Sequence, residues 1–148
     1  MSGANTIEVI ARAVIRRGDQ VLLCQMKEGA NWWFLPGGHV EFGELVKEAL
    51  LRELEEELGL RQVTIKSLIG TVENKFPVGD RIQHELNLVF EVEETEEQLI
   101  ESREVHLEFA FLDVNETLIL PTALQNGLLE WLNSGKTFWK GLEPERVR

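Results

Sequence analysis

A glycine-rich loop followed at once by an acid-loaded helix constrains this chain more than any other feature of its sequence. The stretch is GHVEFGELVKEALLRELEEELGL, residues 38–60. On a helical wheel, three carboxylates fall within one arc of about 100°, namely Glu53, Glu56 and Glu57. Side chains of like charge at this spacing weaken an isolated helix. A hard divalent cation such as Mg²⁺ or Mn²⁺ would relieve the repulsion, because such ions prefer oxygen ligands. The stretch therefore favours a metal site.

A run of acidic residues is more often the solvated face of an amphipathic helix, and composition alone favours that alternative. The spacing of the residues favours the metal site. It follows the pattern G-x5-E-x7-R-E-L-x-E-E-x-G-L, whose defined positions are Gly38, Glu44, Arg52, Glu53, Leu54, Glu56, Glu57, Gly59 and Leu60. So many fixed positions match by chance far less often than a short motif does.

At every defined position this pattern resembles the signature of the Nudix (MutT-like) hydrolases, whose box would span residues 38–60. The similarity continues more loosely in residues 33–38, 104–112 and 120–121. The resemblance implies the Nudix α/β/α sandwich with a mixed sheet, as a single domain over residues 1–148. It also implies metal-dependent hydrolysis of a nucleoside diphosphate linked to another group X, with water attacking phosphorus.

The resemblance also implies roles for the charged residues of the box. We expect Glu56 and Glu57 to bind Mg²⁺ or Mn²⁺. Glu53 would be a further ligand or the group that takes a proton from the attacking water. Arg52 would orient Glu53 through a bidentate contact. The alternative for Arg52 is an ordinary surface ion pair, which contributes little. Glu44 is expected in the first turn of the helix, where the helix dipole favours a negative charge.

Further metal ligands are expected outside the box helix. Gly37 and Gly38 can take backbone conformations closed to other residues, which would turn carbonyl oxygens toward an ion; the alternative is an ordinary tight turn. Members of the family often recruit one more carboxylate from the later part of the chain, which is acid-rich at residues 93–104. Our candidates, in order of preference, are Glu104, Glu97 and Glu85.

Apolar periodicity places other elements around the box. Strands are predicted at residues 8–16, 20–27, 63–72, 82–92 and 106–112, and a loop at 74–80. The box helix should run from about residue 44 to 58, with Gly59 as its left-handed cap. A second helix is expected from Pro121 to about residue 133, ended by Gly135. Residues beyond Gly135 either pack back or fray. Strands around two helices predict a mixed α/β domain.

Two details of the predicted strand at residues 82–92 bear on the core. Apolar and polar residues alternate along it, with Val89 as the one exception. His84 falls on the apolar side, where a histidine is more often a satisfied core residue than a catalytic base.

Composition excludes several classes of partner. A net charge of −11 argues against binding a long nucleic acid. It leaves room for a small phosphorylated nucleotide, because a bound metal inverts the local electrostatics. No apolar run is long enough to span a membrane, and residues 1–6 do not resemble a signal peptide. Cys24 is the only cysteine, so a reducing compartment, the cytoplasm, is expected. The sequence leaves a homodimer open.

Substrate specificity lies in loops rather than in the box. Pro77 lies off the position associated with ADP-ribose hydrolases, and the absence of tyrosine removes a mark of dinucleoside polyphosphate hydrolases. We therefore expect a nucleoside triphosphate pyrophosphohydrolase, with an ADP-ribose or other nucleotide-sugar pyrophosphatase as the alternative. A nucleotide-sensing module without catalysis and an isomerase acting on a diphosphate are further alternatives. The intact acidic set argues against the sensing module.

Overall fold

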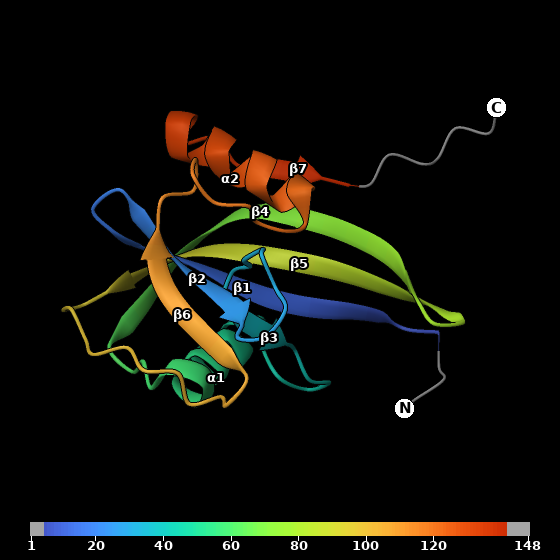
Figure 1. Ribbon diagram of the computed structural model, residues 1–148, viewed down its shortest axis with the longest axis horizontal. Coiled ribbons are helices and arrows are strands. Elements are labelled where there is room, and N and C mark those ends of the chain that lie inside the picture. Colours follow the sequence, from blue (N-terminus) through green and yellow to red (C-terminus); the bar gives the residue numbers. More distant parts are fainter. Residues whose placement is uncertain (1–4, 142–148) are drawn as a thin grey trace.

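One mixed sheet lies between two helices in the computed structural model, which describes residues 5–141 (Figure 1). The elements in chain order are β1 (Ile7–Arg17), β2 (Gln20–Met26), β3 (Gly37–His39), α1 (Val46–Leu58), β4 (Val63–Val78), β5 (Arg81–Glu94), β6 (Leu107–Leu112), α2 (Thr122–Ser134) and β7 (Phe138–Lys140). The strand order is β6-β2-β1-β5-β4-β7, and β3 pairs with β1. In Figure 1, α2 lies above the sheet and α1 below it. The predicted mixed α/β sandwich is confirmed.

The sheet is mixed because two of its pairings are parallel. β1 runs parallel to β5 along nine residues, from Ile7 opposite His84 to Ile15 opposite Val92. β7 runs parallel to β4, and the other pairings are antiparallel. β1 is thus paired with β2, β3 and β5, which places it at the centre of the sheet.

Each face of the sheet has its own apolar core, because alternate residues of a strand point to opposite faces. Val14 and Val89 pack on the α2 side with residues such as Leu124 and Leu128. Ala13 and Phe90 pack on the α1 side with α1 residues, among them Leu50, Leu54 and Leu58. Val89, the exception in the alternation of its strand, is thereby explained: the sheet is covered on both faces at this point.

The prediction of a loop at residues 74–80 is wrong. β4 continues to Val78, and a turn at Gly79 and Asp80 leads directly into β5. The pairing extends to Val78 opposite Arg81, with Pro77 opposite Ile82. Gly79 forms the turn of a hairpin. Pro77 lies within the strand just before this turn, where a proline is tolerated if no hydrogen bond from its nitrogen is needed.

Both helices begin slightly later than predicted. α1 starts at Val46, and Glu48 Oε1 accepts a hydrogen bond from Leu45 N–H at 2.9 Å. Glu44 therefore lies before the helix rather than in its first turn. Gly59 takes the predicted left-handed conformation, with φ 69°, and caps α1. Pro121 likewise precedes the first residue of α2.

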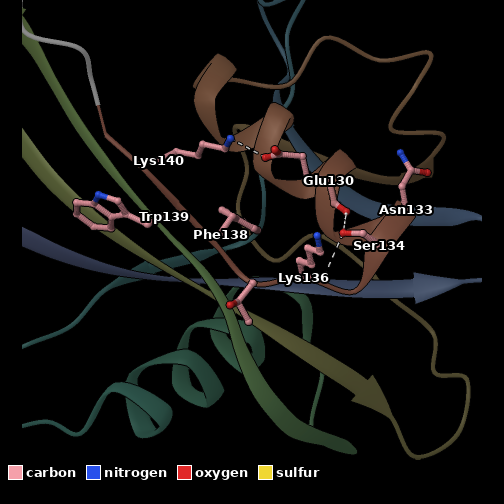
Figure 2. A pocket seen from close by; sticks show the side chains of 8 residues that line it. Glu130, Asn133, Ser134, Lys136, Phe138, Trp139 and Lys140 are labelled. Carbon is pink, nitrogen blue, oxygen red and sulfur yellow. Dashed lines mark hydrogen bonds and ion pairs between the residues drawn. The ribbon is translucent and has the colours of Figure 1, made fainter.

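The chain packs back after α2 and forms β7, which the sequence did not predict. The Phe138 ring lies where a Cβ on Gly70 of β4 or on Gly127 of α2 would collide with it. Gly127 inside α2 is explained by this close approach. Beside it, Lys140 Nζ contacts Glu130 at 2.6 Å across a surface hollow between β7 and the end of α2 (Figure 2). The last part of the predicted tail, residues 142–148, lies outside the described residues.

Candidate active site

Arg52 hydrogen-bonds to three carboxylates of α1 and the loop before it. Its guanidinium donates two hydrogen bonds to Glu44, at 2.7 and 3.0 Å, and one to the backbone oxygen of His39 at 3.1 Å. Arg52 Nη1 also donates to Glu53 at 2.9 Å and to Glu56 at 3.3 Å. The expectation of a bidentate contact with Glu53 is therefore wrong. The bidentate partner is Glu44, because that carboxylate stands before the helix and faces the fork of the guanidinium.

Glu44 also closes the loop that leads into α1. Its Oε1 accepts a hydrogen bond from Glu41 N–H at 3.1 Å. The hydrogen bonds from Arg52 lower the pKa of the Glu44 carboxyl, so this residue keeps its negative charge. Arg52 is thus fixed at one end of its fork and presents the remaining donors to Glu53 and Glu56.

Glu57 carries the most perturbed carboxyl of the site. Burial, followed by repulsion from Glu53, raises the pKa of Glu57 to about 7, although a hydrogen bond from Gly37 N–H opposes the rise. Glu57 Oε1 is closed off from solvent and has no hydrogen-bond partner among residues 5–141. An unpartnered buried carboxylate oxygen is costly unless something binds it.

Gly37 and Gly38 form strand β3 opposite Arg12 and Ala11 of β1, rather than a free loop. A Cβ at Gly38 would collide with the carboxylate of Glu53, and one at Gly37, whose φ is 139°, would collide with Ala11 O. Glycine at position 38 leaves room for the Glu53 carboxylate to lie directly against the backbone, and a larger residue would displace that carboxylate. Ligation by the carbonyl oxygens of these glycines stays a prediction.

Glu104 is the candidate from the later part of the chain whose charge acts on a carboxylate of the box. Arg103 N–H donates to the backbone oxygen of Glu57 at 2.7 Å, which holds the neighbouring residue against the end of α1. The charge of Glu104 contributes to the raised pKa of Glu57. Glu97 instead lies near Arg17, and Glu85 accepts a hydrogen bond from Gln83 on β5.

The residues fit a hard divalent cation, although among residues 5–141 no three His, Cys, Asp or Glu side chains form a ready-made ligand cluster. Within the described residues, Glu57 has a buried oxygen without a hydrogen-bond partner. The Glu53 carboxylate occupies the space that a Cβ at position 38 would fill. Glu56 is mostly exposed, with 57% of its side chain open to solvent. These are carboxylate oxygens, which Mg²⁺ and Mn²⁺ prefer.

Two polar residues near the box were not anticipated, half-buried Arg12 on β1 and buried Asn87 on β5. Arg12 Nε donates to Asn87 Oδ1 at 3.2 Å. The signal in the sequence was an arginine inside the apolar run of residues 8–16. His84, expected in the core, is instead half-buried and contacts Glu73 at 2.7 Å, away from the box.

The comparison with known families agrees with this geometry. A family model described as the NUDIX domain matches residues 6–133. The chain belongs to the Nudix family. It is 31% identical over 138 residues to an uncharacterised Nudix hydrolase, YvcI, of Bacillus subtilis (strain 168). The aligned region covers 91% of this chain and 85% of that protein.

Two further similar proteins extend the comparison to a named activity and a solved structure. The chain is 37% identical over 84 residues to an ADP-ribose pyrophosphatase of Methanocaldococcus jannaschii, covering 55% of this chain and 48% of that protein. The crystal structure of a MutT NUDIX hydrolase from Burkholderia pseudomallei superposes with a TM-score of 0.65 and 25% identity, covering 82% of this chain and 96% of that one. This Nudix hydrolase thus belongs to a family that acts on nucleotide pyrophosphates and generally uses divalent metals such as Mg²⁺.

Within residues 5–141, neither helix is long and apolar enough to cross a bilayer.

Proposed function

We propose that this Nudix hydrolase cleaves a pyrophosphate bond of a nucleoside triphosphate in a metal-dependent reaction. The observation that carries the proposal is Glu57, whose buried Oε1 has no hydrogen-bond partner within the described residues and whose charge is repelled by Glu53. A solvated acidic face would not bury a carboxylate in this way. The alternative of a helix that is merely charged is therefore the weaker one.

Glu53, Glu56 and Glu57 would hold the metal, with Glu104 and the carbonyl oxygens of Gly37 and Gly38 as further ligands. The ion would neutralise charge on the pyrophosphate and polarise its oxygens. Transfer of a phosphoryl or nucleotidyl group needs charge neutralisation and an aligned nucleophile more than covalent help. The chain's own residues must therefore supply position and a proton acceptor.

Glu53 is our candidate for accepting the proton of the attacking water. Its carboxylate is held by Arg52 on one side and lies against Gly38 on the other. Arg52 is itself fixed by Glu44, so it acts as a positioning residue for Glu53 rather than as a substrate ligand. A preorganised carboxylate of this kind loses little freedom when it reacts.

For the substrate, a nucleoside triphosphate is our first choice, because the sequence lacks the marks of the dinucleoside polyphosphate and ADP-ribose subfamilies. An ADP-ribose or other nucleotide-sugar pyrophosphatase is the second. It is favoured by the relative from Methanocaldococcus jannaschii, which is named an ADP-ribose pyrophosphatase.

A substrate panel tests the proposal. Nucleoside triphosphates, sugar nucleotides, ADP-ribose and dinucleoside polyphosphates are incubated with Mg²⁺ or Mn²⁺, and substrate and products are separated and quantified by anion-exchange chromatography. We expect hydrolysis of a triphosphate with metal and none with chelator. Fast cleavage of ADP-ribose alone would select the second substrate class. Tight binding without hydrolysis anywhere in the panel would support the sensing module and refute the enzyme.

A further inference from the structure

Within the described part of the chain, Arg12 differs from the other arginines of β1 in having no carboxylate partner. Arg16 contacts Glu91 at 3.0 Å, and Arg17 contacts Glu94 through two hydrogen bonds at 2.9 and 3.0 Å. Among residues 5–141, the guanidinium of Arg12 donates only to neutral oxygens, those of Asn87 and Leu35. Its positive charge is therefore not balanced by direct contact with an acid.

The contacts of Arg12 hold its guanidinium in one place. Nε donates to Asn87 Oδ1 at 3.2 Å, and Nη1 donates to Leu35 O at 3.0 Å. The guanidinium carbon lies 5.9 Å from the centre of the Phe34 ring. Asn87 is itself only 2% exposed and donates to Val72 O at 3.4 Å. Three neighbours thus orient a cation before any ligand arrives, which lowers the entropic cost of binding.

Such a cation costs stability rather than adding to it. Burial lowers the pKa of Arg12, which shows that its surroundings disfavour the charged form. Replacing buried ionic groups by well-packed apolar residues of similar volume is often neutral or stabilising. Packing therefore does not account for an arginine at this position, and a ligand of opposite charge would.

Within residues 5–141, part of the Arg12 guanidinium makes no hydrogen bond, and Arg12 lies on the strand that pairs with β3. Nη2 of Arg12 donates to no atom of residues 5–141, and the residue as a whole is only partly buried. Arg12 is paired in register with Gly37, whose N–H binds Glu57. The charges of Glu57 and Glu53 are close enough to act on Arg12. An anion held by the box would thus find a second cationic group on the adjacent strand.

We propose that Arg12 is a substrate-binding residue whose Nη2 donates to a phosphate oxygen of the pyrophosphate group. This inference rests on the proposed function for its substrate class. Guanidinium groups suit phosphate because their fork of donors matches two oxygens, and such charge-assisted bonds are stronger than neutral ones. The competing role is structural: Arg12 would act only as a distant counter-ion for Glu57 and Glu85.

Binding of inorganic imidodiphosphate tests the inference without requiring turnover. Calorimetry in the presence of Mg²⁺ gives its affinity for the wild type, Arg12→Gln and Arg12→Lys. We expect a loss of about tenfold or more for Arg12→Gln, the size typical of a lost hydrogen bond to a charged group. Arg12→Lys keeps the charge but loses the fork, so we expect a smaller loss, about threefold or more.

Arg16→Gln is the matched control, because Arg16 lies on the same strand and the same face. Its guanidinium contacts Glu91 and stacks 5.1 Å from the Trp131 ring, so both of its interactions are with the protein. We expect it to lower the melting temperature and leave the affinity for imidodiphosphate unchanged. The Arg12→Gln variant should instead bind imidodiphosphate more weakly than the wild type and melt at the same temperature or higher.

Kinetics on a cleaved nucleotide add a second readout. Arg12→Gln should raise KM by about tenfold and change kcat less, the pattern of a residue that binds the ground state. Unchanged imidodiphosphate affinity in Arg12→Gln, or no binding by the wild type, would overturn the inference. If Arg12→Gln does not fold, the affinity of Arg12→Lys decides, and equality with the wild type overturns it. Arg12-dependent binding without hydrolysis of any nucleotide would refute the proposed function and leave the inference standing.

Discussion

Replacing Glu57 by Gln keeps the shape of the side chain and removes one charge from the acidic arc of α1. In the metal-free protein the Glu57 carboxyl has a pKa of about 7, raised from 4.5 by burial and by Glu53. This rise corresponds to a cost of at most about 3 kcal/mol for the ionised form at pH 8. The variant avoids that cost. In the variant, the new amide nitrogen can occupy the Oε1 position, which has no hydrogen-bond partner among residues 5–141. An unsatisfied buried donor destabilises the variant by about 1–3 kcal/mol, which offsets part of the gain.

The sign of the pH dependence follows from the raised pKa. Between pH 4.5 and about 7 the folded wild type holds a proton that the unfolded chain has released. The stability of the metal-free wild type relative to Glu57→Gln should therefore fall as pH rises through that interval and level off above it. With chelator at pH 8, the variant should melt at the same temperature as the wild type or a few degrees higher.

Added metal should reverse this order. The wild type should gain about 2.7 kcal/mol at a hundredfold excess of Mg²⁺ or Mn²⁺ over Kd, by mass action. Glu57→Gln should gain much less, and its hydrolysis should nearly vanish. Thermal melts of both proteins with chelator and with metal provide the assay. Glu55→Gln is the control, since Glu55 lies on the same helix but contacts exposed Arg61. Equal metal-induced shifts in wild type and Glu57→Gln would refute the assignment of Glu57 as a ligand.

Two further changes test the positioning of Glu53. Arg52→Ala should lower kcat by about tenfold or more and raise KM less, because Arg52 orients Glu53 and Glu56; steady-state kinetics with unchanged kcat and a large rise in KM would show that Arg52 binds substrate instead. Gly38→Ala should lower kcat by a similar factor while the protein stays folded, because the new Cβ would displace the Glu53 carboxylate. Activity equal to that of Gly141→Ala, whose Cβ meets only ordinary contacts, would contradict this.

The box helix and its cap could be predicted because their signals are local. The spacing of Arg52, Glu53, Glu56 and Glu57 places them on neighbouring faces of any helix, whatever surrounds it. Gly59 follows the last apolar residue of α1 and takes the left-handed conformation typical of such a position. These features depend on residues within one or two turns of each other.

The rest of the fold depended on partners distant in the chain. β4 continues through Pro77 because β5 pairs with it to the end of the hairpin, and a turn signal alone does not show where pairing stops. β7 forms because Phe138 meets Gly70 and Gly127, which lie in two different elements. Neither contact leaves a periodic mark on the sequence near it.

The candidate site divides in the same way. Its acidic residues could be named from the pattern, but the partner of Arg52 could not, because Glu44 and Glu53 both lie within reach of its side chain. Only the path of residues 40–45 decides that Glu44 takes the bidentate contact. Arg12 was missed because a single charged residue in a strand does not reveal which neighbours it lacks.

The short strand β7 has a consequence for self-association. It lies beyond residues 6–133, the part matched by the family model, and covers Gly70–Val72 on the outer edge of β4, one of the longest strands. Unpaired strand edges recruit edges of other molecules. Without Phe138, a ring-sized apolar gap would open beside two glycines that cannot fill it. β7 thus shields the centre of the sheet's edge, and its loss would favour aggregation through the exposed edge of β4.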